Sequence, residues 1–390
     1  MARLQFVGGN RLTLLRSGAE FFPALEAAIE RAAREIHLQT YIFKADPTGG
    51  RIAAVLKRAA ARGVAVRLLI DGFGSNELPE DFVAGLREAG VRVLSFRPDP
   101  APWRLKRNRL RRMHRKVAVA DGGLAFVGGI NIEDDIAPDG PPAPRFDFAV
   151  AVEGPLAAEV HQMARRLWGV VAWSRLRRRR ALPAPPPPVA AAGGQRAALA
   201  RRDNLRHRHD IEGVYLDAIA AARSEVLIAN AYFLPGRRFR RALMEARARG
   251  ARVVLLLQGR MEYVLQHYAT RALYGALLDA GVEIHEYQKS YLHAKVACVD
   301  GRWATVGSSN IDPFSLLLAR EANVVVDDPG FAGELRETLL RAIQEDSETV
   351  HRERWRDEPL LRRALSWLAY GSVRWIMGVA GYGYHDEPLA

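Results

Sequence analysis

The sequence predicts an α/β fold of two homologous α/β/α sandwich domains, related by a pseudo-twofold axis with the functional site at their interface. The first observation is an internal repeat at a spacing of about 180–190 residues, too long for a solenoid. The second is the alternation of amphipathic helices with apolar runs inside each half, which is typical of α/β layering. The third is size, because 390 residues with 49% hydrophobic side chains suit about two domains with buried cores.

Each half predicts the same elements in the same order. An amphipathic helix leads into an apolar strand, a second helix closes at Ala-Arg-Gly before another apolar strand, and a short helix and strand follow. A hairpin ends the repeated part. The matched segments are AAIERAAREIHLQTYIF (27–43) with DAIAAARSEVLIANAYF (217–233), RIAAVLKRAAARGVAVRLLIDG (51–72) with FRRALMEARARGARVVLLLQG (239–259), LREAGVRVLSF (86–96) with LLDAGVEIHEY (277–287), and MHRKVAVADGGLAFVGGINIEDD (113–135) with LHAKVACVDGRWATVGSSNIDPF (292–314).

Turn residues punctuate these elements at equivalent places. Gly63 and Gly250 follow the second helix of each half, and Gly90 and Gly281 follow the third, where a left-handed C-cap glycine is expected. Asp-Gly in each hairpin suits a type I′ turn.

The repeat sets the predicted domain limits. The first domain covers residues 1–174 and the second covers 201–350, with a basic, Pro-rich interdomain segment at 175–200. Residues 351–390 form a tail whose part 364–384 is rich in Trp and Tyr. An arginine near its middle and several glycines disfavour a spanning helix, so we expect a segment lying at a membrane interface; packing on the core is the alternative.

Composition and charge narrow the classes of function. The single cysteine, Cys298, excludes an intrachain disulfide framework and a Cys-based zinc site. The net charge of +13 favours anionic partners such as phosphate esters, nucleic acid or an anionic membrane. A basic run at 103–115 strengthens that preference. We see neither a secretory h-region at the N-terminus nor a clean run of about 20 apolar residues.

The motif His-x-Lys-x-x-x-x-Asp occurs once in each half. Its residues are His114, Lys116 and Asp121 in the first half and His293, Lys295 and Asp300 in the second. Residues i and i+2 of a strand project from the same face, so each histidine and lysine should point into the same space. The protein has only six lysines, and two of them lie in this motif. Two half-buried polar pairs without function are the alternative, which the matched contexts disfavour.

A turn of small residues and an asparagine follows each motif. Gly129 and Asn131 in the first half correspond to Ser308 and Asn310 in the second. Small residues let backbone N–H groups approach a phosphate, and Asn and Ser can donate further hydrogen bonds. Together with His and Lys, these residues predict an oxyanion-binding set.

At this point the sequence resembles the phospholipase D superfamily, whose signature is a duplicated HxKxxxxD followed by G-[GS]-x-N. Longer phrases, among them RRMHRKVAVAD, FVGGIN, HAKVACVD and WATVGSSNIDPFSLLLAREANVVV, are similar to bacterial cardiolipin synthases, most of all to the B type. The resemblance covers nearly the whole chain and departs in the linker and the tail.

The resemblance implies a phosphatidyltransferase that works in two steps without metal or cofactor. One histidine attacks the phosphodiester phosphorus, forming a phosphohistidine, while the other protonates the leaving alcohol and then deprotonates the acceptor. We expect His114 to be the nucleophile, since family members commonly use the first copy. Aligned strands pair Asp147 with Glu321, and the family places a histidine-orienting carboxylate there. Asp121 and Asp300 belong to the catalytic motif but sit at the hairpin turns, which indicates a structural role.

The implied partners are anionic phospholipids, phosphatidylglycerol and cardiolipin, at a membrane surface, with no nucleic acid expected. We expect a peripheral protein on the cytoplasmic face of a bacterial inner membrane. A hydrolytic phospholipase D or a nuclease of the same superfamily stays open, because the same residues serve any phosphodiester. A non-catalytic lipid- or DNA-binding protein is a third interpretation, which the intact duplicate motif opposes. The second substrate and the oligomeric state are not readable from the sequence.

Overall fold

A computed structural model of the chain describes residues 4–98, 111–136, 141, 143–176, 189–204, 206–356 and 359–379. The Pro run of the linker, the basic residues 103–110 and the last eleven residues lie outside this part. The first half contains β1 (Val7–Arg16), α1 (Ser17–Arg31), β2 (Glu35–Thr40), α2 (Pro47–Ala61), β3 (Ala65–Asp71), α3 (Glu80–Glu88), β4 (Arg92–Phe96), β5 (Lys116–Ala120), β6 (Leu124–Gly128), β7 (Phe148–Glu153) and α4 (Pro155–Leu176).

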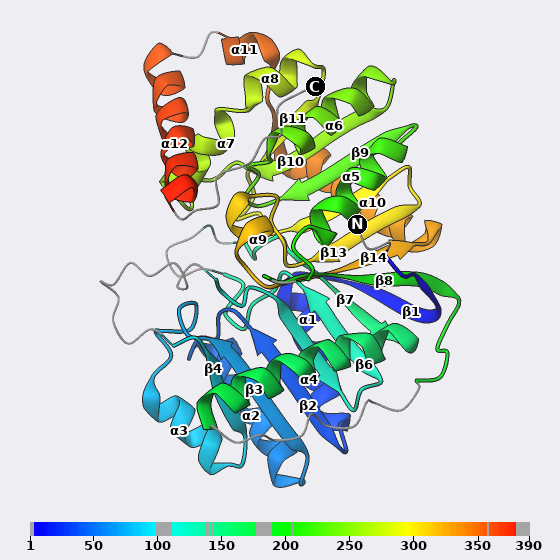
Figure 1. Cartoon of the computed structure of the whole chain (residues 1–390), viewed down its shortest axis with the longest axis vertical. Coiled ribbons are helices and arrows are strands. Elements are labelled where there is room, and N and C mark those ends of the chain that lie inside the picture. Colours follow the sequence, from blue (N-terminus) through cyan, green and yellow to red (C-terminus); the bar gives the residue numbers. More distant parts are fainter. Residues whose placement is uncertain are drawn as a thin grey trace.

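The second half repeats this order and adds elements at its end. It contains β8 (Gln195–Arg202), α5 (Asp210–Ala221), β9 (Glu225–Asn230), α6 (Arg237–Ala248), β10 (Arg252–Gln258), α7 (Val264–Arg271), α8 (Tyr274–Asp279), β11 (Glu283–Tyr287), β12 (Lys295–Val299), β13 (Trp303–Gly307), α9 (Pro313–Leu317), β14 (Glu321–Asp327), α10 (Pro329–Asp346), β15 (Ser347–Thr349), α11 (Arg352–Arg356) and α12 (Leu360–Val379). Figure 1 shows the two halves one above the other, with helices on both faces of the sheet.

The strand order confirms the predicted pseudo-symmetry. One 15-stranded sheet runs β15-β11-β10-β9-β12-β13-β14-β8-β1-β7-β6-β5-β2-β3-β4, so the order reads alike outward from the central β8·β1 pair. The pairs among β2, β3 and β4, and among β9, β10 and β11, are parallel, whereas the remaining ladders are antiparallel. The two sandwiches therefore share a continuous sheet. Strand β8 begins at Gln195, inside the predicted interdomain segment.

Among the described residues, the three largest of four apolar clusters hold the layers together. One lies under α4 and α10 and takes strand residues from both halves. A second packs α1 and α2 on the first half, and a third packs α5, α6, α7 and α8 on the second. Aspartate side chains cap the N-termini of two helices. Asp46 caps α2 by accepting the Gly49 N–H at 2.8 Å, and Asp328 caps α10 by accepting the Phe331 N–H at 2.9 Å.

The turns form as the glycines and Asp-Gly pairs predict. Gly63, Gly90, Gly250 and Gly281 all have φ between +83° and +99°. In the hairpins β5–β6 and β12–β13, Asp121 and Asp300 have φ of +51° and the glycines after them are also positive, the type I′ pattern. These tight turns fix the register of the two hairpins, and therefore which way the residues before them face.

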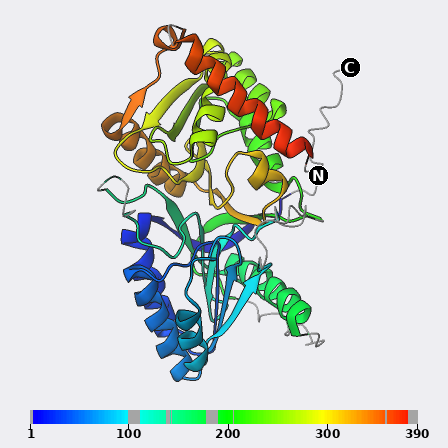
Figure 2. The same cartoon turned by 90° about the vertical axis from the view of Figure 1, so that its left-hand side faces the viewer.

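Helix α12 has two different faces. Val373 and Ser366 are buried, and the helix packs against α7. Trp367, Leu368 and Trp375 on other parts of the helix are 57%, 67% and 70% exposed. Figure 2 shows α12 lying along the outside of the second half. No helix in the described ranges is both long and apolar enough to cross a bilayer. The described part of the tail therefore packs on the second half and also exposes aromatic side chains, while residues 380–384 of the predicted segment lie outside the described residues.

Candidate active site

Each histidine stands two residues before the start of a strand, β5 or β12, and is held by backbone bonds to the opposite half. The N–H of His114 donates to the carbonyl of Arg320 at 3.0 Å, and the N–H of His293 donates to the carbonyl of Phe146 at 2.9 Å. Arg320 immediately precedes Glu321, and Phe146 immediately precedes Asp147, so each carbonyl lies next to a predicted orienting carboxylate. The two motif copies therefore meet at the interface between the halves, as predicted from the repeat.

The carboxylates are exchanged between the halves. Nδ1 of His114 lies 2.9 Å from Oε1 of Glu321, and Nδ1 of His293 lies 2.6 Å from Oδ2 of Asp147. A carboxylate on Nδ1 fixes the tautomer and leaves the Nε2 lone pair for chemistry. Sequence alignment placed both acids, but it did not tell which histidine each one would hold.

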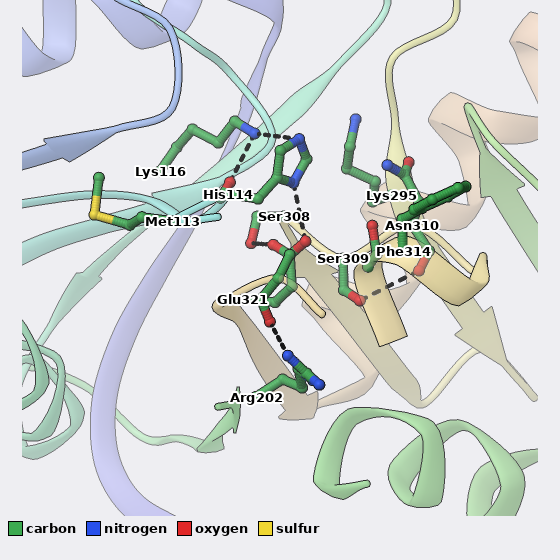
Figure 3. Close-up of polar contacts among 12 residues, drawn as sticks. Met113, His114, Lys116, Arg202, Lys295, Ser308, Ser309, Asn310, Phe314 and Glu321 are labelled. Carbon is green, nitrogen blue, oxygen red and sulfur yellow. Dashed lines mark hydrogen bonds and ion pairs between the residues drawn. The ribbon is translucent and has the colours of Figure 1, made fainter. Parts of the chain in front are cut away.

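The lysines complete a compact group of charges. Nζ of Lys116 lies 3.0 Å from Nε2 of His114 and donates to the His114 carbonyl at 2.7 Å. Lys295 donates to the carbonyl of His293 in the same way. Figure 3 shows His114 between Lys116 and Glu321, with Lys295 and Asn310 beyond the imidazole. Both lysines are buried, so a phosphate that enters would meet two ammonium groups with little water around them.

Burial and mutual repulsion shift the pKa values in this group. Burial lowers the pKa of Lys116 to about 7. Burial first, and then the neighbouring Lys116 ammonium, lowers the pKa of His114. The pKa of His293 falls well below its ordinary value through burial, then Lys295 and Lys116. Burial raises the pKa of Asp147 to about 6. An anionic phosphodiester would reverse the repulsion among these cations and raise the pKa of each of them.

The small-residue turns support the carboxylates in two different ways. The hydroxyl of Ser308, which was predicted to bind phosphate, donates instead to Oε2 of Glu321 at 2.5 Å. A Cβ on Gly129 would stand 2.4 Å from Oδ1 of Asp147, so this glycine provides the room that the shorter acid needs. Asn131 donates to Glu133 at 3.2 Å, while Oδ1 of Asn310 is buried without a hydrogen-bond partner among the described residues.

Asp121 and Asp300 lie at the other ends of β5 and β12 from the lysines. Asp121 accepts the backbone N–H groups of Ala33, Arg34 and Glu35, each at 2.8 Å. Asp300 accepts the equivalent groups of residues 223–225. Each aspartate thus ties a hairpin to the start of the neighbouring strand, which agrees with the structural role that their turn position indicated.

Further side chains surround the two histidines, among them Tyr41 and Tyr232, which end matching strands of the repeat and for which the sequence left core packing and a place beside the site as alternatives. Tyr41 packs edge-on against His114 at 4.8 Å between ring centroids, and Tyr232 lies 6.5 Å from His293 in the same manner. Glu133 pairs with Lys44 at 3.1 Å and with Arg145 at 3.3 Å. The repeat held a signal for Glu133, because it aligns with Asp312, which caps α9, whereas the described residues 134–136 after Glu133 form no helix.

The basic run next to His114 is partly used inside the protein. Arg112 pairs with the buried Asp71 at 2.8 Å. Arg115 is buried, and its Nη2 donates to Oε1 of Gln39 at 2.6 Å. These two arginines therefore brace the strand that carries His114. The rest of the run up to residue 110 lies outside the described residues.

A group of potential metal ligands exists elsewhere, although the sequence showed none. Ligand atoms of Glu35, His37 and His161 lie within 4.8 Å of one another, at the end of β2 remote from His114. Nη1 of Arg67 lies 2.6 Å from Oε2 of Glu35 and already occupies that carboxylate. The carboxylate of Glu35 thus pairs with Arg67 and with both histidines of this group.

Two histidines, two lysines and exchanged carboxylates at the interface of a duplicated α/β fold define a phosphodiester-processing class of protein. The family model described as "Cardiolipin synthase, PLD-like domain" matches residues 25–168 and 215–343. The chain therefore belongs to the phospholipase D-like cardiolipin synthase family.

Known proteins agree with this assignment, and a solved structure shows the same fold. The chain is 39% identical over 365 residues to cardiolipin synthase B of Escherichia coli K12, covering 94% of this chain and 86% of that one. It is 33% identical to a cardiolipin synthase of Geobacillus thermodenitrificans, covering 80% of this chain and 62% of the other. The crystal structure of phosphatidylserine synthase from Haemophilus influenzae Rd KW20 has the same fold, with a TM-score of 0.70 at 14% identity, covering 96% of this chain and 97% of that one.

Proposed function

We propose that the protein is a phosphatidyltransferase that makes cardiolipin-type lipids, moving a phosphatidyl group from phosphatidylglycerol to a hydroxyl of a second phospholipid. The observation that carries this proposal is the pair of histidines, each with Nδ1 on a carboxylate of the opposite half. The similarity to cardiolipin synthases over 94% of the chain supports the substrate class.

The geometry supports a two-step mechanism. The phosphate of the donor lipid binds between Lys116 and Lys295 and draws the Lys116 ammonium away from Nε2 of His114, which frees the lone pair. Nε2 of His114 attacks phosphorus as the P–O bond to the leaving glycerol breaks, and His293 gives that oxygen a proton. In the second step the acceptor hydroxyl passes its proton to His293, its oxygen bonds to phosphorus, and the P–N bond to His114 breaks.

The lysines supply the charge that stabilises the equatorial oxygens of the transition state. Lys116 and Lys295 donate from a buried site, where hydrogen bonds to a charged oxygen are stronger than in water. Asn310, whose amide oxygen has no partner among the described residues, can turn its amide toward the same phosphate. Glu321 stabilises the positive charge that His114 gains when its Nε2 bonds to phosphorus, and Asp147 stabilises the protonated form of His293.

The test is incubation of the pure protein with phosphatidylglycerol vesicles and analysis of products by mass spectrometry. We expect cardiolipin and free glycerol in equal amounts. His114→Ala and His293→Ala should each lower the rate by at least about 10⁴-fold, with normal melting temperatures. Phosphatidic acid as the sole product would establish hydrolysis instead. Cleavage of nucleic acid with no action on vesicles would replace the lipid proposal altogether.

We also propose that the protein docks peripherally on the cytoplasmic face of a bacterial inner membrane. The exposed Trp367, Leu368 and Trp375 of α12 suit the headgroup layer, where aromatic rings are favoured. The net charge of +13 adds attraction to anionic lipid, worth about 1 kcal/mol for each basic residue at the surface.

Vesicle flotation at low and high salt tests this docking. Changing the three exposed α12 side chains to alanine should make binding to anionic vesicles fully salt-reversible, because charge attraction is screened and apolar insertion is not. Trp173→Ala on α4, which removes a tryptophan of 55% exposure, is the matched control and should leave binding unchanged. Salt-resistant binding that survives the triple change would place the anchor elsewhere.

A further inference from the structure

An exposed apolar segment, residues 261–265, lies between β10 and the first turn of α7. Four of its five side chains, Met261, Tyr263, Val264 and Leu265, are between 42% and 60% exposed. Single exposed apolar side chains are ordinary on a protein surface, whereas a contiguous group of them marks a surface that meets an apolar partner. We call residues 261–265 the lip.

The lip borders the opening of the histidine site. The side chains of His114 and His293 are 17% and 14% exposed, so the site is open to solvent. The ring of Tyr263 stands 5.8 Å from the ring of Tyr232, which lies 6.5 Å from His293. Tyr263 is therefore one aromatic ring away from a catalytic histidine.

Tyr263 is also near the tyrosine that packs on the other histidine. The ring of Tyr41 lies 4.8 Å from His114. Burial, and then the carboxylate of Asp71, raises the pKa of Tyr41, and Tyr263 is close enough to raise it further. The lip thus lies beside the part of the site where both halves meet, and not beside one histidine alone.

The charges of the lip suit an anionic surface. Arg260, which immediately precedes the lip, is exposed. Glu262 is the single acidic residue in the lip, and it is turned inward, where its Oε2 accepts the Tyr232 hydroxyl at 2.9 Å. The outer face of the segment therefore combines apolar side chains with a positive charge, the combination that binds anionic lipid.

Helix α12 continues this surface away from the site. It packs against α7, which begins inside the lip, and Figures 1 and 2 show α12 on the outside of the second half. The sequence of α12 contains no acidic residue, and Arg362, Arg363 and Arg374 are exposed on it. One lipid surface can therefore contact the exposed side chains of α12 and the lip together.

We propose that the lip enters the headgroup layer of an anionic bilayer, and that the substrate phospholipid passes over it to the histidines while its acyl chains stay in the bilayer. The proposal rests on the proposed function. A phospholipid that left the bilayer completely would expose its acyl chains to water, which costs free energy for every CH₂ group. An apolar lip at the opening avoids that exposure, so α12 holds the protein on the membrane and the lip admits the substrate.

The first test compares bilayer lipid with dissolved lipid. Long-chain phosphatidylglycerol is supplied in vesicles, at a concentration at which flotation finds all of the protein bound, and dibutyryl phosphatidylglycerol is supplied as dissolved monomers. Release of glycerol measures both rates. Changing Met261, Val264 and Leu265 together to serine should lower the ratio of the vesicle rate to the monomer rate at least about 10-fold, because three apolar side chains no longer favour the lipid layer.

The matched control for the serine variant lies on α4. Val170 and Trp173 are 57% and 55% exposed there, and changing both to serine should leave the ratio of the two rates as it is in the unaltered protein.

The second test locates the lip without using activity. Cys298 is the single cysteine and is buried, so a cysteine introduced by Val264→Cys can be labelled selectively with a bimane fluorophore. Anionic vesicles that contain spin-labelled lipid should quench this label by at least about half, since the label enters the headgroup layer. A label introduced by Trp367→Cys on α12 should be quenched similarly, and one introduced by Val170→Cys should keep its intensity.

An unchanged ratio of rates in the serine variant would overturn the proposal while leaving phosphatidyl transfer in place. A label at position 264 that stays bright when the label at position 367 is quenched would also overturn it, because the lip would then face away from the membrane. No release of glycerol from vesicles or from monomers by the unaltered protein would overturn the proposed function, and with it the passage of a substrate over the lip.

Discussion

The two histidines occupy the same place in the repeat, but their supports are built differently. His114 rests on Glu321, a longer acid that also takes the hydroxyl of Ser308, whereas His293 rests on Asp147, a shorter acid that fits because Gly129 has no side chain. Chain length of the acid and size of the turn residue have changed together. Both copies of the repeat therefore keep the contact between a carboxylate and Nδ1 of the histidine. The surroundings of the carboxylate differ, so the two histidines can differ in pKa.

The largest effect should come from breaking each carboxylate contact separately. Glu321→Gln and Asp147→Asn each keep the shape but lose the charge that holds the histidine in the active tautomer, so we expect the transfer rate to fall about 10²–10⁴-fold. Phosphatidyl-p-nitrophenol is a donor whose leaving group, p-nitrophenolate, needs no proton. With this donor, Glu321→Gln should slow the first step, while Asp147→Asn should spare it and slow the transfer to alcohol.

The control for these variants is Glu153→Gln at the end of β7, whose carboxylate pairs with Arg11 on the surface. It should retain full activity. If Asp147→Asn slows both steps equally, with phosphatidylglycerol and with phosphatidyl-p-nitrophenol, the two carboxylates are equivalent. The structural difference between the halves then has no effect on the rates of the two steps.

An intermediate effect should appear in the pH dependence. The pKa of Lys116 is lowered to about 7 by burial, so this lysine loses its charge as the pH rises through that value. Because the charged form binds the phosphate, kcat/KM should fall above about pH 7, by about tenfold for each further pH unit. Lipid binding raises the pKa again, so kcat itself should fall at higher pH than kcat/KM.

Lys116→Arg tests the assignment, since arginine stays charged over the whole range. This variant should lose the decline above pH 7, although its maximal rate should be lower because the longer side chain fits the site less well. Lys289→Arg, at an exposed lysine paired with Asp346, should keep the original profile. A decline that persists in Lys116→Arg would assign it to another group.

The smallest effect on activity is expected at the motif aspartates. Asp121→Ala removes the acceptor for three backbone N–H groups and should lower the free energy of unfolding by about 1–3 kcal/mol. The transfer rate at low temperature should stay within about 2-fold of the unaltered protein, because Asp121 lies at the far end of β5 from Lys116. Thermal melting measures the change in stability, and the transfer rate at about 15 °C measures the change in activity. A large loss of rate without loss of stability would show that Asp121 takes part in catalysis.

Much of the fold and of the histidine site could be predicted because the two halves of the sequence carry the same motifs in the same order. Matched hairpins placed His114 and His293, and aligned strands found Asp147 and Glu321. The exchange of carboxylates could not be found in this way, since a repeat shows which residues are equivalent and not which ones touch.

The pairing of β1 with β8 and the exchange of Asp147 and Glu321 between the halves determine what would happen if the chain were cut between them. A break anywhere between Leu176 and Gln195 would leave two fragments joined by a sheet ladder and by a shared apolar layer under α4 and α10. Each fragment alone would hold a histidine without its acid. Produced as separate polypeptides, the halves would therefore be inert singly and would regain activity by fragment complementation, as an obligate heterodimer.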